Sequence, residues 1–294
     1  MSQSFDLDWL RLREVADRRA RSRALARRFA MAVRARARGD TAVLLDLGAG
    51  TGANFRALAP LIPGDQDWRL IDRDAQLLAH QPAEIAQWAR AQGYRVAHGS
   101  GIAAISSGDA QWRAHSVALD VTALDRLPLA GVHGVTCSAL LDLVSMDWLG
   151  DLVRRLGAAR LPFLAALSTD GRREWQPAHE ADPVIAAAFA RNHRGDKGFG
   201  PALGGDAPEE AASVLRGVGY AVESELTDWR LGAESEALLE LLIDGTAAAA
   251  TEADTAATPA IAEWRTARHA ERESATLRLL IGHQDIFAGM TASP

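Results

Sequence analysis

The residues best suited to chemistry form a glycine-rich turn directly after a run of apolar residues. The run at 42–47 contains Asp46, and the turn Gly48-Ala49-Gly50-Thr51-Gly52 follows it. A continuous apolar run that ends in glycines is typical of a buried parallel strand. Because glycine has no side chain, the backbone of such a turn can approach a bound ligand closely. The spacing therefore predicts a nucleotide-type ligand at this turn.

The full string LLDLGAGTG resembles motif I of the class I S-adenosylmethionine-dependent methyltransferases. In that family the turn accommodates the amino-acid part of the cofactor, which has no pyrophosphate. Dinucleotide-binding folds instead prefer G-x-G-x-x-G, with the third glycine inside the helix. The glycine spacing thus disfavours a nicotinamide dehydrogenase, and the resemblance implies S-adenosylmethionine as the cofactor.

Later strand ends match the same family in order. Asp72 lies twenty residues beyond Gly52 and resembles the acid that accepts both ribose hydroxyl protons, with Asp74 as the alternative. Asp120 resembles the acid that takes the adenine amino hydrogen, and the next backbone amide, of Val121, meets the ring. The resemblance covers roughly residues 41–168. The cofactor-binding set that it implies is Asp46, Gly48, Ala49, Gly50, Gly52, Asp72, Asp120, Val121 and Ser138.

Two residues are candidates for a catalytic role. Methyl transfer from sulfur is an in-line displacement, so a general base is needed only when the acceptor arrives protonated. Asp142 follows the fourth expected strand, at the sheet edge where open α/β folds bind ligands; the alternative is a capping or surface aspartate. His193 lies in the charged, glycine-rich segment 191–206, which suits an anionic or polyhydroxylated acceptor; the alternative is an ordinary solvated loop.

Charge is uneven along the chain, whose net charge is −6. Residues 1–40 carry eleven arginines and five acids, about +6, so the remainder is about −12. Apolar residues recur at helical spacing among these arginines, which predicts amphipathic helices with a solvated basic face; nucleic-acid docking is the alternative. Arg13 and Arg21 are candidate donors to the cofactor carboxylate. The single lysine, Lys197, is interpreted as the result of a bias in composition, with no functional role.

The order of elements predicts an α/β fold. Strand and helix patterns alternate from 42 to 168, which favours a parallel sheet with helices on both faces. The resemblance implies a Rossmann-like, seven-stranded, mostly parallel sheet whose last strand is antiparallel between the fifth and sixth. The expected divisions are an N-terminal helical extension or lid (1–40) and a methyltransferase domain (41–294), with a cofactor half at 41–168, an acceptor half at 169–294 and a C-terminal helical insertion.

Two segments resist assignment. Residues 98–114 are rich in glycine and serine and lie between strands expected at 94–97 and 115–119. The Ala/Thr tract at 246–258 is interpreted as a solvent loop or a weak helix.

The leading functional hypothesis is a cytoplasmic methyltransferase that acts on an oxygen or nitrogen of a small molecule, as a monomer or homodimer. The lone cysteine, Cys137, excludes an internal disulfide and is expected to be a packing residue; no metal site and no membrane span are expected. The alternatives are an RNA or protein methyltransferase that docks through the basic N-terminal helix, and a non-catalytic S-adenosylmethionine-binding protein. Family members that methylate base nitrogens carry Asn/Asp-Pro-Pro-aromatic where this chain has Ser138-Ala139-Leu140-Leu141, so nucleic acid is a disfavoured partner.

Overall fold

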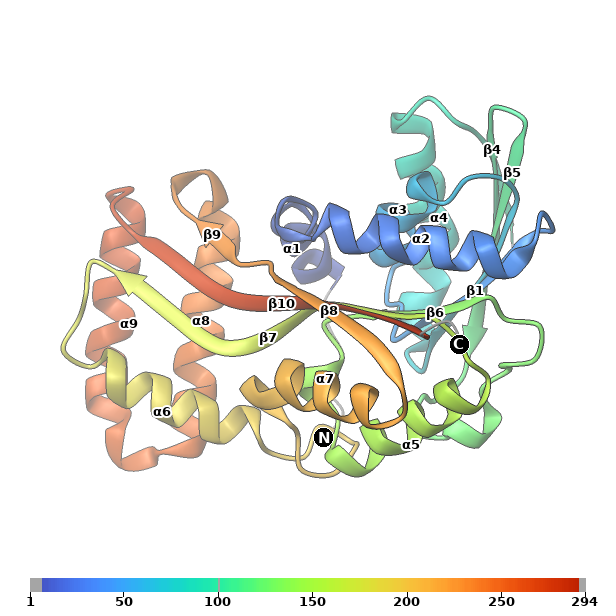
Figure 1. Cartoon of the computed structure of the whole chain (residues 1–294). Coiled ribbons are helices and arrows are strands. Elements are labelled where there is room, and N and C mark those ends of the chain that lie inside the picture. The colour runs from blue at the N-terminus through green and yellow to red at the C-terminus, as the bar shows by residue number, and fades with distance from the viewer. Residues whose placement is uncertain (1–6, 100, 291–294) are drawn as a thin grey trace.

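One twisted sheet runs through the molecule and organises the rest (Figure 1). The computed structural model describes residues 7–99 and 101–290. Its strands are β1 (Ala42–Leu47), β2 (Gln66–Asp72), β3 (Arg95–Gly99), β4 (Ile102–Ser107), β5 (Ala110–Ala118), β6 (Gly134–Ser138), β7 (Phe163–Gln176), β8 (Tyr220–Leu226), β9 (Trp229–Leu231) and β10 (Arg278–Met290). They are ordered β3-β4-β5-β2-β1-β6-β7-β10-β8, and β9 pairs with β10.

The centre of the sheet has the expected topology. β5, β2, β1, β6 and β7 are parallel neighbours. The last strand, β10, lies antiparallel between β7 and β8. This confirms the predicted Rossmann-like α/β sheet with an antiparallel final strand. The predicted number of seven strands is too low, because ten strands lie within the described residues.

The additional strands lie at the two ends of the sheet. Residues 98–114, left unassigned from the sequence, contain β4 and the first half of β5, which pair as an antiparallel hairpin, and β3 pairs with β4. β3 matches the strand expected at 94–97, and it is a mostly exposed edge strand. The third added strand, β9, has only three residues.

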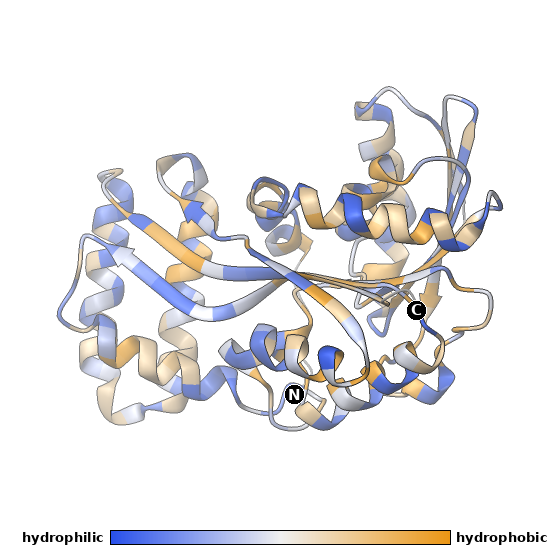
Figure 2. Ribbon diagram, in the orientation of Figure 1, coloured by the Kyte–Doolittle hydropathy of each residue, from blue (hydrophilic) through white to orange (hydrophobic). Residues whose placement is uncertain are grey.

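Helices cover both faces of the sheet. They are α1 (Leu7–Ala20), α2 (Arg23–Ala37), α3 (Ala53–Leu58), α4 (Ala75–Ala91), α5 (Met146–Ala158), α6 (Asp182–His193), α7 (Ala207–Gly217), α8 (Glu236–Ala253) and α9 (Thr258–Glu273). One apolar core joins α2, α3 and α4 to one face, and a second joins α5 and α7 to the other. Hydrophilic and hydrophobic residues alternate along these helices (Figure 2), as burial of one face requires. No helix in the described ranges is long and apolar enough to cross a bilayer.

A long ribbon extends the sheet into a helical lobe. β7 and β10 continue past the other strands and pack against α6, α8 and α9 (Figure 1). The lobe has its own apolar core, which includes Trp175 and Trp264 in an edge-to-face contact. For the tract at 246–258, interpreted as a solvent loop or a weak helix, the solvent-loop alternative is wrong and most of the tract is helical. α8 runs to Ala253, and Ala247 and Ala250 are buried in this lobe.

The N-terminal segment folds as two helices, as the periodicity predicts. Leu25, Phe29 and Val33 of α2 are buried on the sheet, while α1 lies at the edge of the sheet against α8 and β9. Several arginines of this segment make ion pairs with other elements. Arg11 pairs with Glu84, and Arg28 pairs with Glu223, so the basic face is partly neutralised.

Candidate functional site

The glycine turn after β1 has backbone φ angles that residues other than glycine rarely adopt. Gly50 has φ +52° and Gly52 has φ +83°, both in the left-handed region that glycine favours. A Cβ added at Gly52 would lie 3.0 Å from Cδ1 of Ile85 on α4. The backbone N–H of Ala49 donates to the carbonyl of Ile71 at 2.9 Å, which joins the turn to the end of β2. The two glycines are therefore needed for the conformation of the turn, and a backbone hydrogen bond fixes the turn to the end of β2.

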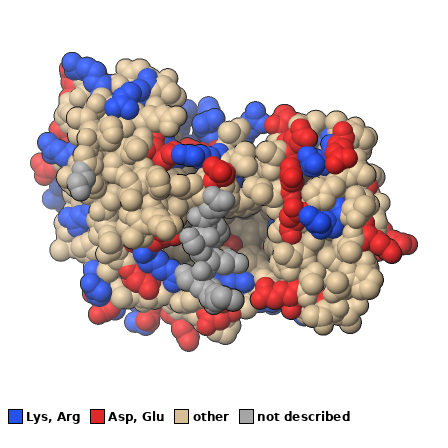
Figure 3. All heavy atoms as spheres, turned by 180° about the vertical axis from the view of Figure 1, so that it is seen from behind, with Lys and Arg blue, Asp and Glu red and all other residues tan. Residues whose placement is uncertain are grey.

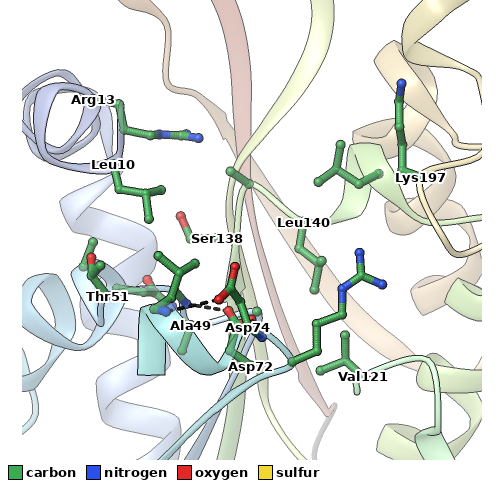
Figure 4. Close-up of a pocket in the computed structure, with 18 of the residues that line it drawn as sticks. Leu10, Arg13, Ala49, Thr51, Asp72, Asp74, Val121, Ser138, Leu140 and Lys197 are labelled. Carbon is green, nitrogen blue, oxygen red and sulfur yellow. Dashed lines mark hydrogen bonds between the residues drawn. The ribbon is translucent and has the colours of Figure 1, made fainter. Parts of the chain in front are cut away.

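Asp72 ties the ends of β1 and β2 together. Its Oδ2 accepts from the backbone N–H of Gly50 at 2.7 Å, and its Oδ1 accepts from that of Asp74 at 2.9 Å. Asp74 in turn caps α4 by accepting from the backbone N–H of Gln76. Figure 4 shows Asp72 and Asp74 beside the turn. The carboxylate of Asp72 is thereby held at the edge of the open space in front of the turn.

Arg21 crosses the carboxyl ends of the strands. Its guanidinium donates to Oδ1 of Asn54 and to Oγ of Ser138, each at 2.8 Å. Asn54 is itself fixed, because its Nδ2 donates to Oδ1 of Asp46 at 2.7 Å and to Oγ1 of Thr136 at 3.1 Å. Among the described residues Arg21 makes no salt bridge; both of its partners are neutral. Its guanidinium is therefore held by neutral hydrogen-bond partners, while its charge also interacts with the buried carboxyl groups of Asp46 and Asp285. Asn54 was not predicted from the sequence, where its only signal is a polar residue two positions after Gly52.

Asp46 lies behind the turn and is fully buried. Burial raises the pKa of Asp46 to about 7, although the Asn54 hydrogen bond and the charge of Arg21 both lower it. Its Oδ2 has no hydrogen-bond partner in the described structure. Asp46 thus supports Asn54, and through Asn54 supports Arg21.

Asp46 should make the free energy of unfolding depend on pH. In the unfolded chain its pKa returns to about 3.9, so from about pH 4 to pH 7 the folded state holds a proton that the unfolded state has lost. The free energy of unfolding then falls as pH rises through this window. We expect Asp46→Asn to remove this pH dependence. Between pH 4 and pH 8 the free energy of unfolding of the variant then rises, relative to that of the wild type, by up to about 4 kcal/mol. Urea unfolding across this range measures it, with exposed Asp125→Asn as the control. An unchanged slope would contradict the assignment.

A cavity of about 970 Å³ opens in front of the turn. It lies between α1, the strand ends and the loop after α6, and Figure 4 shows Arg13 and Lys197 on opposite sides of it. Six of the predicted cofactor-binding residues line it: Gly48, Ala49, Gly50, Asp72, Val121 and Ser138. The lining does not include Asp46, Gly52 or Asp120; Oδ1 of Asp120 accepts from the backbone N–H of Thr122.

The two predicted catalytic residues contact each other. Nε2 of His193 lies 3.2 Å from Oδ2 of Asp142, and both side chains are largely buried. This burial excludes the surface alternative for Asp142. His193 is the last residue of α6 and not part of a loop. Neither residue is part of the cavity lining, whereas Leu140 and Leu143, on either side of Asp142 in sequence, are.

Helix α1 forms one wall of the cavity and is held there by ion pairs. Arg56 of α3 donates to both carboxylate oxygens of Glu14, at 2.8 and 2.6 Å. Arg13 pairs with the buried Asp17 at 3.0 Å, and Asp17 also accepts from Nε1 of Trp229. No group of three or more His, Cys, Asp or Glu within 7–99 and 101–290 is arranged to hold a metal ion.

Comparisons with known proteins give matches only among structures. A scan of protein-family models and a search of curated proteins each find none. A candidate type II methyltransferase from Anaeromyxobacter dehalogenans aligns over 92% of this chain and 96% of its own, at 17% identity and TM-score 0.47. An S-adenosylmethionine-dependent methyltransferase from Thiobacillus denitrificans in complex with S-adenosylhomocysteine aligns over 99% and 100%, at 15% identity and TM-score 0.43. A cyclopropane synthase from Mycobacterium tuberculosis aligns over 84% and 78%, at 11% identity and TM-score 0.41.

The strand order, and not these scores, identifies the fold. Five parallel strands place the glycine turn at the carboxyl edge of the sheet, and the final strand is antiparallel between β7 and β8. The chain therefore has the fold of the class I S-adenosylmethionine-dependent methyltransferases.

Proposed function

We propose that this protein binds S-adenosylmethionine and transfers its methyl group to an oxygen or nitrogen of a small molecule. One observation carries the proposal. The turn at Gly50, the carboxylate of Asp72 and the guanidinium of Arg21, which has only neutral hydrogen-bond partners, face one cavity at the carboxyl edge of the sheet. The turn and Arg21 complement the amino-acid end of the cofactor with its carboxylate, and Asp72 complements the ribose.

The side chains present suit this cofactor. We expect Asp72 to accept from the ribose hydroxyls and the backbone amide of Val121 to meet the adenine ring, and both residues line the cavity. Bound S-adenosylmethionine would supply a methyl group already activated by the positive sulfur. The protein then has to align the acceptor and exclude water. Leu140, Leu143 and Phe199 give the cavity apolar lining for that purpose.

Arg21 is the better of the two candidate donors to the cofactor carboxylate. Arg13 is already neutralised by Asp17, and its guanidinium lies 5.1 Å from the ring centroid of Trp229. Arg21 has only neutral partners. A charge-assisted hydrogen bond to a carboxylate is about twice as strong as a neutral one. The cofactor carboxylate is therefore expected to bind more strongly to Arg21 than to Arg13.

The catalytic roles of Asp142 and His193 remain predictions. The pair can hold or move a proton between Oδ2 and Nε2, which a general base requires. An acceptor that arrives deprotonated needs no such base. We propose the pair as the base for a protonated acceptor, a role that requires the side chain of Leu143 to move aside because neither residue lines the cavity.

A small acceptor is favoured over RNA or protein. The cavity of about 970 Å³ is at the upper end of the range of small-molecule sites, which leaves room for an acceptor beside the cofactor. The arginines of α1 and α2 are partly neutralised by acids, and basic and acidic side chains are interspersed on the hollowed face in Figure 3. Nucleic-acid binding favours a continuous basic surface.

Turnover with a fractionated cell extract tests this choice. The protein is incubated with S-adenosylmethionine and either the fraction below about 1 kDa or the macromolecular fraction, and S-adenosylhomocysteine is measured. We expect the wild type and the control Asp125→Asn to form product with the small-molecule fraction. We expect Asp72→Ala to form none. Product only with the macromolecular fraction supports the RNA or protein alternative. Cofactor binding without product in either fraction supports a non-catalytic role.

A further inference from the structure

Two basic side chains from different walls of the cavity come together at Gly198. Arg73 follows Asp72 at the end of β2, and Lys197 precedes Gly198 in the loop after α6; both line the cavity. A Cβ built on Gly198 would lie 3.1 Å from Nη1 of Arg73, so the guanidinium lies close to the residue that follows Lys197. The fold therefore places two basic residues in the lining of the same cavity.

Among the described residues, neither cation makes a salt bridge with a carboxylate. Nζ of Lys197 donates to the backbone carbonyl and to Oδ1 of Asn192, at 3.0 and 3.3 Å, which are neutral oxygens. An ammonium has three hydrogens, so one is left for another acceptor. In the described part of the chain Arg73 makes no hydrogen bond and no salt bridge. The adjacent acid, Asp196, accepts from the backbone N–H groups of Gly198 and Gly200 and makes no salt bridge with Lys197 in the described structure.

The loop that carries Lys197 is anchored in place. Asn192, which holds the ammonium, donates through Nδ2 to Glu252 on α8 at 2.9 Å. On the other side, Arg194 pairs with Asp206 at 2.7 Å. Lys197 is thus held at the cavity before any ligand binds, which reduces the entropy lost when a ligand is bound.

The cofactor does not supply the missing negative charge. S-adenosylmethionine carries one carboxylate and no phosphate, and Arg21 is placed for that carboxylate. Arg73 and Lys197 are then left without an anion when the cofactor is bound. Like charges that share a site repel each other, and an anionic oxygen group between them removes the repulsion.

We propose that Arg73 and Lys197 bind an anionic oxygen group, a carboxylate or a phosphate, of the methyl acceptor. This inference rests on the proposed function and narrows it to acidic small molecules. It also gives the lone lysine a role that its composition-based interpretation missed.

Calorimetric titration of simple anions tests the site directly. Inorganic phosphate and acetate are each titrated, at low salt, into protein saturated with S-adenosylhomocysteine. We expect millimolar binding of at least one anion, weakened fivefold or more by Lys197→Gln and by Arg73→Gln. The matched control is Arg95→Gln, which removes an exposed arginine from the edge strand β3 and should leave anion binding unchanged. The anion that binds more tightly identifies the group on the acceptor.

The single lysine allows a second measurement. An amine-reactive reagent can modify only one side chain, and peptide mass spectrometry then reports the labelling rate of Lys197. We expect saturating phosphate or acetate to slow this rate severalfold in the wild type and to have little effect in Arg73→Gln. Equal labelling rates with and without the anion would overturn the proposal.

The outcomes separate this inference from the proposed function. If S-adenosylhomocysteine binds but neither anion does, the anion site is wrong and the cofactor assignment stands. If Arg73→Gln weakens S-adenosylhomocysteine more than fivefold while anion binding is unchanged, Arg73 serves the cofactor and the proposal fails. If S-adenosylhomocysteine does not bind, the proposed function fails, and titration of the unliganded protein still tests the two cations.

Discussion

Asp72→Ala should weaken binding of S-adenosylhomocysteine by at least about 100-fold. The carboxylate is expected to accept from two ribose hydroxyls, and hydrogen bonds to a charged group contribute about 1.5–3 kcal/mol each. The same change removes the acceptor for the backbone N–H of Gly50, so the glycine turn also loses its link to the end of β2. Isothermal titration calorimetry of the purified variant measures the loss.

Two controls make this result specific. Asp125→Asn removes an exposed acid that does not line the cavity, and Asp142→Asn removes the partner of His193. Both should bind S-adenosylhomocysteine within about threefold of the wild type, and thermal unfolding should show that Asp72→Ala is folded. A folded Asp72→Ala that binds normally would refute the ribose assignment.

Arg21→Gln should weaken S-adenosylhomocysteine by about 10- to 100-fold, in line with the loss of one charge-assisted contact. The glutamine keeps a polar side chain near Asn54 and Ser138 but has no charge for the carboxylate. Binding of 5′-methylthioadenosine, which lacks the amino-acid end, should change little. Titration of both ligands into the wild type and the variant therefore isolates the carboxylate contact.

The matched control is Arg23→Gln, an exposed arginine at the start of α2, two residues further along the chain. It should leave both affinities unchanged. An equal loss of affinity for the two ligands in Arg21→Gln would show that the arginine acts through the fold of the site and not through the carboxylate.

The features predicted correctly from the sequence are local ones. β1 spans 42–47 as expected, because a continuous apolar run before glycines carries its own signal. Asp72 and Val121 line the cavity because the carboxyl ends of parallel strands meet at one edge of a sheet. The buried face of α2 also followed from its helical periodicity.

The features that were missed depend on contacts between distant parts of the chain. Arg21 is positioned by Asn54 and Ser138, which are 33 and 117 residues away in sequence. The helix over the Ala/Thr tract becomes evident only when the lobe buries it. β4 lies in the unassigned stretch 98–114, and its pairing with β3 and β5 supplied the information that the sequence lacked.

Calorimetric titration of S-adenosylhomocysteine into the wild-type protein is the most direct test of the cofactor site. We expect one site per chain with a dissociation constant in the micromolar range, about −8 kcal/mol, and clear loss of that binding in Asp72→Ala. Absence of binding to the folded wild-type protein would contradict the account.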